Sequence, residues 1–155
     1  MGNFEQAMKF VLKYEGGYNH VPGDAGGETN YGISDRGDGV VDGRSKYGTP
    51  IKDLTLEEAL SVYRIDYWDA YNLDSQPLPL CVAMMDAYVQ HRPSVVRKLI
   101  DAGQGSWKEF NAARRLFYLR LIDKNPSQIK FKRGWMNRMN DLDKYCTILE
   151  ETPTV

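Results

Sequence analysis

The chain has 155 residues, 42% of them hydrophobic and 26% charged, with a formal net charge of −1. A chain of this length and composition folds around a sizeable core, which excludes a disordered or fibrous protein. No apolar run reaches the roughly 18 residues that a transmembrane helix needs, and the N-terminus lacks the basic and continuously apolar stretches of a signal peptide.

The first predicted element is a helix that begins near Phe4. Apolar residues recur with helical period from Phe4 to Leu12, Asn3 offers an N-cap, and Gly16-Gly17 end the helix because glycine adopts left-handed conformations readily. Glu15 therefore lies in the last turn, where the helix dipole places partial negative charge. This charge, together with partial burial, is expected to raise the pKa of Glu15 and make it a proton donor. A solvated helix-end glutamate is the simpler interpretation.

A glycine-rich segment, residues 18–48, follows this helix and predicts a small β-sheet with tight turns. It contains Asp24 and Thr29. Glycoside hydrolysis uses two carboxyl groups flanking the scissile bond, of which one protonates the leaving oxygen and the other activates water. Glu15 and Asp24 fit these roles, and the Thr29 hydroxyl can hold the water. On spacing alone, Asp24 as a turn residue and Thr29 as a strand residue remain open alternatives.

Signals for helix starts recur through the rest of the chain: capping boxes, in which Ser or Thr is followed three residues later by Glu, and prolines that fit a first helical turn. They lie at 55–58, Pro79, Pro93 and 106–109, and residues 125–128 (Asn-Pro-Ser-Gln) start a last helical region. The first of these helices should reach about Tyr71, and a loose tail is expected from Glu150.

The predicted fold is therefore α+β and predominantly helical, with a small β-lobe between the first helix and a helical lobe. We expect a single domain over residues 1–155. Within it, residues 1–78 carry the first helix and the β-lobe, and residues 79–155 form the helical lobe.

Charge is spread unevenly along the chain. Residues 1–80 carry 13 acidic and 7 basic side chains, whereas residues 81–155 carry 8 acidic and 13 basic ones. The basic back half predicts an anionic partner, with solvated helix faces as the simpler interpretation. Cys81 and Cys146 lie far apart without a CxxC motif, which excludes a zinc finger and a disulfide framework and predicts free, packed thiols.

Aromatic side chains offer large apolar faces with a polar edge, so those in the front half are candidates for stacking on sugar rings. The candidate substrate contacts are Tyr18, Asn30, Tyr31, Trp68 and Tyr71. Each of these aromatic residues, taken alone, is more often a core residue. Those in the back half are expected in the core: Trp107, Phe110, Phe117 and Trp135.

No metal or cofactor is expected. Asp35, Asp38 and Asp42 cluster among glycines, but their spacing is not that of an EF-hand loop. A polar turn is the preferred interpretation of this cluster, and a bound ion is the alternative.

Two stretches near the candidate acid carry a family resemblance. Glu15-Gly16-Gly17-Tyr18 and residues 24–33 (DAGGETNYGI) resemble the signature of the phage and bacterial N-acetylmuramidases of glycoside hydrolase family 108, and Tyr67-Trp68 resembles a Tyr-Trp pair of that family. Further residues resemble the family's peptidoglycan-binding region: Arg115, Tyr118, Pro126, Phe131, Gly134, Trp135 and Arg138. The stretch Leu99–Phe110 is shorter than in that region, so the resemblance is stronger in the front half.

The resemblance implies a lysozyme-like fold and a cofactor-free enzyme that cleaves the β-1,4 bond between N-acetylmuramic acid and N-acetylglucosamine. It implies that Glu15 is the catalytic acid. By order and spacing, Asp24 and Thr29 resemble members of the phage-lysozyme triad, which implies that they position and activate water and that the reaction inverts the anomeric carbon.

We therefore expect a peptidoglycan-degrading endolysin, made in the host cytoplasm without a signal peptide and acting on the cell wall in the periplasm. Its expected partners are peptidoglycan glycan strands and a separate pore-forming protein for release. Neither nucleic acid binding nor membrane insertion is expected, and a monomer is the expected state.

Three other functions stay open. A lytic transglycosylase would use Glu15 alone and leave anhydro ends on its products. A non-enzymatic cell-wall-binding protein would use the aromatic residues and the basic back half. A nucleic-acid module built on residues 92–138 would show steep salt dependence, but the acidic front half counts against it.

Overall fold

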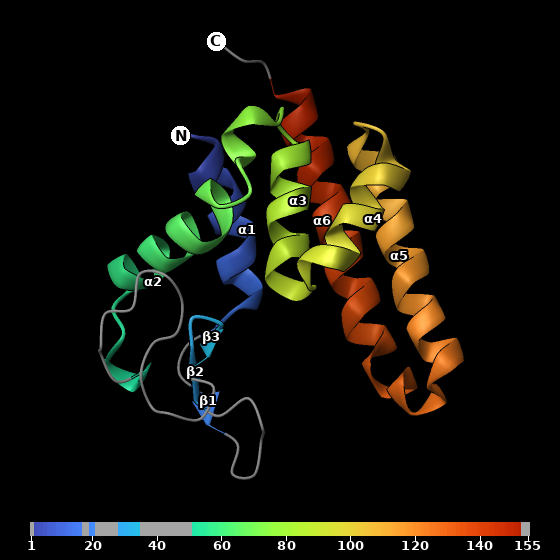
Figure 1. The fold of residues 1–155 in the computed structure, drawn as a ribbon, viewed down its shortest axis with the longest axis horizontal. Coiled ribbons are helices and arrows are strands. Elements are labelled where there is room, and N and C mark those ends of the chain that lie inside the picture. Colours follow the sequence, from blue (N-terminus) through green and yellow to red (C-terminus); the bar gives the residue numbers. More distant parts are fainter. Residues whose placement is uncertain (1, 17–18, 21–27, 35–50, 153–155) are drawn as a thin grey trace. The chain divides into compact units, whose positions relative to one another are not determined.

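The computed structural model describes residues 2–16, 19–20, 28–34 and 51–152. Over these residues the chain is predominantly helical with one small antiparallel sheet, which confirms the predicted α+β class (Figure 1). The chain divides into two compact units, residues 1–75 and 76–155, here called the sheet unit and the helical unit. The prediction of a single domain stays a prediction.

The sheet unit begins with α1 (Asn3–Tyr14), which buries Phe4 and Val11 among other apolar residues of one stripe. The predicted cap is wrong by one residue, because Gly2 is the N-cap and Asn3 is already helical. The helix ends at Tyr14, so Glu15, which was predicted in the last turn, is the C-cap instead. Glu15 leaves the helical conformation with φ −91° and ψ 93°, and its backbone N–H still donates to the carbonyl oxygen of Val11 at 2.9 Å.

The sheet has the strand order β1-β2-β3, with β1 (Asn19–His20), β2 (Glu28–Asn30) and β3 (Ile33–Ser34) all antiparallel to their neighbours. Thr29 on the central strand pairs with Asn19 on one side and Ser34 on the other. Asn30 pairs with Ile33, so a two-residue turn joins β2 to β3. Both turn residues have positive φ, +53° at Tyr31 and +79° at Gly32, as the type I′ turn that matches strand twist requires.

After the short 3₁₀ helix η1 (Ile51–Asp53), α2 (Leu56–Tyr63) starts at the predicted capping box. The Thr55 hydroxyl accepts from the Glu58 N–H at 3.1 Å, and the Glu58 carboxylate accepts from the Thr55 N–H at 3.1 Å. The helix continues as the π-helix η2 (Arg64–Asp69) and is followed by η3 (Leu73–Ser75). The predicted helix to about Tyr71 is therefore α-helical only in its first half.

The helical unit contains α3 (Leu80–Gln90), α4 (Pro93–Gly103), α5 (Trp107–Lys124), the 3₁₀ helix η4 (Pro126–Phe131) and α6 (Lys132–Glu151). In Figure 1, α5 and α6 run side by side as an antiparallel pair joined by η4. Pro93 is the first residue of α4, as predicted, while Pro79 is the N-cap of α3. The expected loose tail from Glu150 is wrong by two residues, because α6 extends to Glu151.

The core of the helical unit forms around α3, in which all nine residues from Leu80 to Tyr88 are buried. Cys81 and Cys146 are buried thiols and neither is part of a disulfide, which confirms their prediction. Burial raises the pKa of the Cys146 thiol to about 12, and Asp143 acts in the same direction. None of the described helices is both long and apolar enough to cross a membrane.

Of the four aromatic residues expected in this core, Trp107 and Phe110 are buried, while Phe117 and Trp135 are only half-buried. Phe117 packs edge-on against His91 at a centroid distance of 5.1 Å, and Trp135 stacks on Tyr118 at 4.8 Å. Both half-buried rings therefore pack against other aromatic groups, in a layer at the margin of the buried core. Helical period alone does not distinguish this layer from the core beneath it.

Candidate active site

Glu15 stands at the end of α1 with a half-buried side chain. The backbone leaves the helical conformation at this residue, so the carboxyl group belongs to the first residue after the last helical turn. The group is partly shielded from water and still accessible to a ligand. This is the environment in which a carboxyl group serves as an acid or a base.

The Glu15 side chain lies directly against the turn between β2 and β3. A Cβ atom built on Gly32 would come within 2.8 Å of Glu15 Cβ, 2.9 Å of Glu15 Oε2 and 2.6 Å of the Tyr63 hydroxyl oxygen. Real Cβ contacts are longer, so only glycine fits here. The left-handed φ of +79° imposes the same requirement independently. The sequence thus brings a helix-end acid into van der Waals contact with a glycine backbone.

Tyr63 holds this turn in place from α2. Its side chain is 1% exposed, and its hydroxyl donates to the Tyr31 carbonyl oxygen at 2.5 Å. Tyr31 is not glycine and yet has φ +53°, a conformation that costs energy and persists only where contacts enforce it. Sequence reasoning missed Tyr63, because its position in α2 has the phase of an ordinary core residue. The available signal was a hydroxyl on a buried face, which requires a partner.

Asn30 and Thr29 alternate on β2, so their side chains point to opposite faces of the sheet. Asn30 is 6% exposed, and its Nδ2 donates to the Ile51 carbonyl at 3.1 Å, with Lys52 and Leu54 carbonyls at 3.4 and 3.5 Å. Its amide therefore fastens β2 to η1, which makes Asn30 a positioning residue rather than a substrate contact. Thr29 is half-buried on the other face, which leaves its proposed role open.

The predicted stacking role of Trp68 is wrong, because its side chain is fully buried. Its Nε1 donates to Asp74 Oδ1 at 2.7 Å, and its ring meets Phe4 edge-on at 5.5 Å. The π-helix η2 carries Trp68 into the core. Tyr31 and Tyr71 are half-buried and so keep exposed surface that a sugar can contact.

Several predicted residues lie outside the described part of the chain: Tyr18, Asp24, Asp35, Asp38 and Asp42. The catalytic roles of Glu15, Asp24 and Thr29 therefore stay predictions. In the stretches that the structure describes, no three His, Cys, Asp or Glu side chains converge as metal ligands would.

The motif residues of the helical unit build its interior. Asp86 on α3 is fully buried and bridges two guanidinium groups, accepting from Arg114 at 2.8 Å and from Arg138 at 2.6 and 3.1 Å. Burial raises the pKa of Asp86, but Arg114 and Arg138 outweigh it and hold that pKa below its usual value. Arg114 also donates to the Tyr118 hydroxyl at 3.2 Å, so the network joins α3, α5 and α6.

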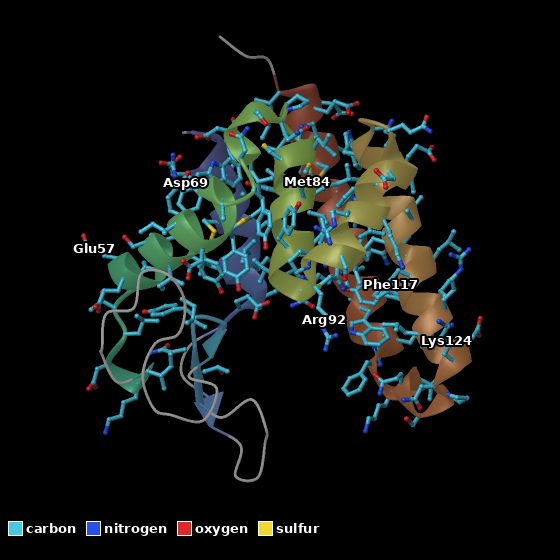
Figure 2. The ribbon with its side chains drawn as sticks, viewed as in Figure 1. Glu57, Asp69, Met84, Arg92, Phe117 and Lys124 are labelled. Carbon is cyan, nitrogen blue, oxygen red and sulfur yellow. The ribbon has the colours of Figure 1, made fainter. Side chains whose placement is uncertain are left out.

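Arg114, rather than the neighbouring Arg115 of the quoted motif, occupies this centre. Arg115 instead pairs with Asp143 on α6. Tyr118 and Arg138 belong to the buried network, and Trp135 covers Tyr118. These motif residues therefore act first as a scaffold. Figure 2 labels Phe117 on α5 and Arg92, an exposed residue at the start of α4, in the same unit.

A half-buried acid at a helix end, set against the turn of a small antiparallel sheet, fits a lysozyme-like glycosidase. Residues 8–91, more than half of the chain, match the family Glycosyl hydrolase 108, and the chain belongs to that family. Residues 94–140 match the family Predicted Peptidoglycan domain. The two matches together indicate a peptidoglycan-degrading glycosidase.

A solved structure supports the fold independently. SagA of Brucella abortus superposes with a TM-score of 0.76, covers 99% of each chain and shares 22% sequence identity. At this identity the likeness concerns the fold alone. No curated protein matches the sequence.

Proposed function

We propose that this glycosidase is an N-acetylmuramidase that acts as an endolysin, with Glu15 as its general acid. The observation that carries the proposal is the position of Glu15 at the end of α1, packed against the Gly32 backbone of a turn that Tyr63 fastens. All three residues lie within the stretch that matches Glycosyl hydrolase 108.

In the proposed reaction, the protonated Glu15 carboxyl gives its proton to the glycosidic oxygen as the bond to the N-acetylmuramic acid C1 breaks. Water attacks C1 from the opposite face of the sugar. The Thr29 hydroxyl holds this water, and Asp24 takes up the proton that the water loses. Because water attacks directly, the anomeric configuration inverts. The spacing of Asp24 and Thr29 after Glu15 and their resemblance to the phage-lysozyme triad support these two roles.

The test is mass spectrometry of soluble fragments released from purified peptidoglycan by the wild type and by Glu15→Gln. We expect fragments that end in reducing N-acetylmuramic acid, and a loss of turnover of about 10²-fold or more in Glu15→Gln, since general acid catalysis contributes that much. Glu5→Gln is the matched control, because Glu5 is an exposed residue on the same helix. Its activity should equal that of the wild type.

Each of the other possible outcomes would contradict part of the proposal. Near-native activity in a folded Glu15→Gln variant would remove Glu15 as the acid. Anhydro ends would identify a lytic transglycosylase and leave Asp24 without a catalytic role. A folded wild type that releases no fragments would favour a wall-binding protein. The configuration of the first product, read by proton NMR, decides between inversion and retention.

A further inference from the structure

The helical unit contains an open pocket that the proposed reaction does not use. Its volume is about 350 Å³, within the range of small-ligand sites. Three segments form it: residues 77–80 at the start of α3, residues 105–108 leading into α5, and Glu150 in the last turn of α6. All of its lining therefore comes from one compact unit.

One wall of the pocket is the Trp107 indole, and two opposite charges flank it. The Trp107 Nε1 donates to a carboxylate oxygen of Glu150, and the Lys108 ammonium lies 5.7 Å from the ring centroid. Lys108 and Glu150 are both exposed. Within the described residues, neither of them forms an ion pair with the other or with a third side chain.

This arrangement suits a ligand that carries both charges itself. A ligand carboxylate would meet Lys108 and a ligand ammonium would meet Glu150, as charge-assisted hydrogen bonds require. The prolines and Leu80 offer apolar surface for an aliphatic stem. A small neighbouring cavity of about 80 Å³ shares Leu80, Gly105 and Ser106 with the pocket and extends this surface toward Met84.

We propose that the pocket binds the free α-amino carboxylate at the end of a diamino acid side chain in peptidoglycan peptides. The proposal rests on the proposed function in taking peptidoglycan as the substrate. Peptide stems that contain meso-diaminopimelate carry this zwitterion on an aliphatic stem, whereas stems that contain lysine end in an ammonium alone. The pocket therefore gives this enzyme a preference for walls of the first kind.

The test is NMR of the protein labelled with ¹⁵N at the indole nitrogens, because the chain has three tryptophans and the Trp107 resonance is assigned with Trp107→Phe. The probes are the free tripeptide L-Ala-γ-D-Glu-meso-diaminopimelate and its L-lysine counterpart. We expect the first to shift the Trp107 resonance saturably and to bind about tenfold more tightly than the second, the worth of one charge-assisted hydrogen bond.

Two variants separate the two charges. Lys108→Gln should lower the affinity for the diaminopimelate peptide to that for the lysine peptide. The affinity for the lysine peptide should stay unchanged. Glu150→Gln should lower the affinity for both peptides. The amide oxygen of the new side chain can still accept the hydrogen bond from Trp107, so the pocket wall is retained. Lys124→Gln and Glu151→Gln are the matched controls, since both residues are exposed and neither lines the pocket.

Equal affinity for the two peptides, or a Lys108→Gln variant that binds the first as the wild type does, would overturn the proposal. The proposal would also be overturned if chitotetraose shifted the Trp107 resonance and the peptides did not, because the pocket would then be a sugar site. The tripeptides contain no glycosidic bond. Failure of the muramidase proposal would therefore leave this binding result intact, and failure of peptide binding would leave the product analysis intact.

Discussion

His91 is the residue whose protonation state the fold constrains most clearly. Arg114 Nε donates to His91 Nε2 at 3.0 Å, so this ring nitrogen is an acceptor and the imidazole is neutral with its proton on Nδ1. Burial lowers the pKa of His91 from 6.5 to about 3, and the Arg114 charge acts in the same direction. A protonated His91 would lose this hydrogen bond and face a guanidinium.

This lowered pKa predicts acid-sensitive stability. Between pH 6.5 and about 3 the unfolded chain binds a proton that the folded chain does not. The contribution of His91 is therefore complete above pH 6.5 and declines as the pH falls, on the order of a few kcal/mol over the window. Urea midpoints measured from pH 7 to 4 should fall in the wild type, and His91→Gln, which keeps an acceptor for Arg114, should flatten the profile. If the urea midpoints of the wild type and of His91→Gln fell equally with pH, His91 would not be the source of the acid sensitivity.

Residues whose roles depend on distant partners could not be predicted from the sequence. Tyr63 reaches a carbonyl 32 residues away, and Asp86 pairs with arginines 28 and 52 residues away. Periodicity assigns such positions to the core correctly but gives no partner for their polar atoms. Glu15 was predictable as a candidate because its environment is local: the end of a helix before two glycines.

Among the elements, the turn between β2 and β3 is the one whose conformation the candidate acid depends on. We expect Gly32→Ala to displace either the turn or Glu15, because its Cβ would lie 2.6–2.9 Å from Tyr63 and Glu15 atoms. Gly105→Ala is the matched strain control, with φ +85° and no atom within 4 Å of its Cβ. It should cost only the roughly 1–2 kcal/mol of a left-handed alanine.

Thermal unfolding of the two variants shows how much stability the close contact at position 32 costs, beyond the cost of the left-handed backbone that both variants share. Gly32→Ala should be the less stable, and its release of peptidoglycan fragments should fall more than its stability explains. Equal stabilities together with wild-type fragment release by Gly32→Ala would show that the turn does not position Glu15.

Local chemistry explains which elements were predictable. The Thr55–Glu58 capping box and Pro93 mark helix starts correctly, because both signals act within one turn. The π type of η2 and the 3₁₀ type of η4 were not predictable, since an apolar pattern indicates a helix but does not give its hydrogen-bond repeat. Trp68 on η2 is buried, and this burial overturned a predicted sugar contact.

At the scale of the whole molecule, the compact units and the family matches divide the chain differently. The match to Glycosyl hydrolase 108 extends to residue 91, whereas the first compact unit ends at residue 75. The difference is α3, which belongs in sequence to the first match and in packing to α4, α5 and α6. Its Asp86 neutralises one of the two buried arginine charges that the second match supplies.

This division predicts which fragment folds. Residues 76–155 should give a cooperative unfolding transition, because they retain α3 and its buried side chains. Residues 94–155 should not, because they lose those side chains and leave Arg114 and Arg138 without Asp86, a loss of about 3–5 kcal/mol for the broken pairs alone. Near-ultraviolet circular dichroism during urea titration measures both. A cooperative transition in the shorter fragment would contradict the role given to α3.

The uneven charge of the chain predicts a salt-dependent rate of wall degradation. Exposed basic residues lie close together in sequence where α5, η4 and α6 follow one another, including Lys124, Lys130 and Lys132. An anionic wall would attract this surface over about one Debye length, ~10 Å at 0.1 M salt. Fragment release should therefore fall several-fold from about 10 mM to 300 mM salt.

The paired variant Lys130→Gln/Lys132→Gln should flatten that decline. The control variant Lys9→Gln/Lys52→Gln, which removes the same charge from exposed positions of the sheet unit, should not. Equal slopes in the two variants would mean that net charge, and not this surface, governs the encounter.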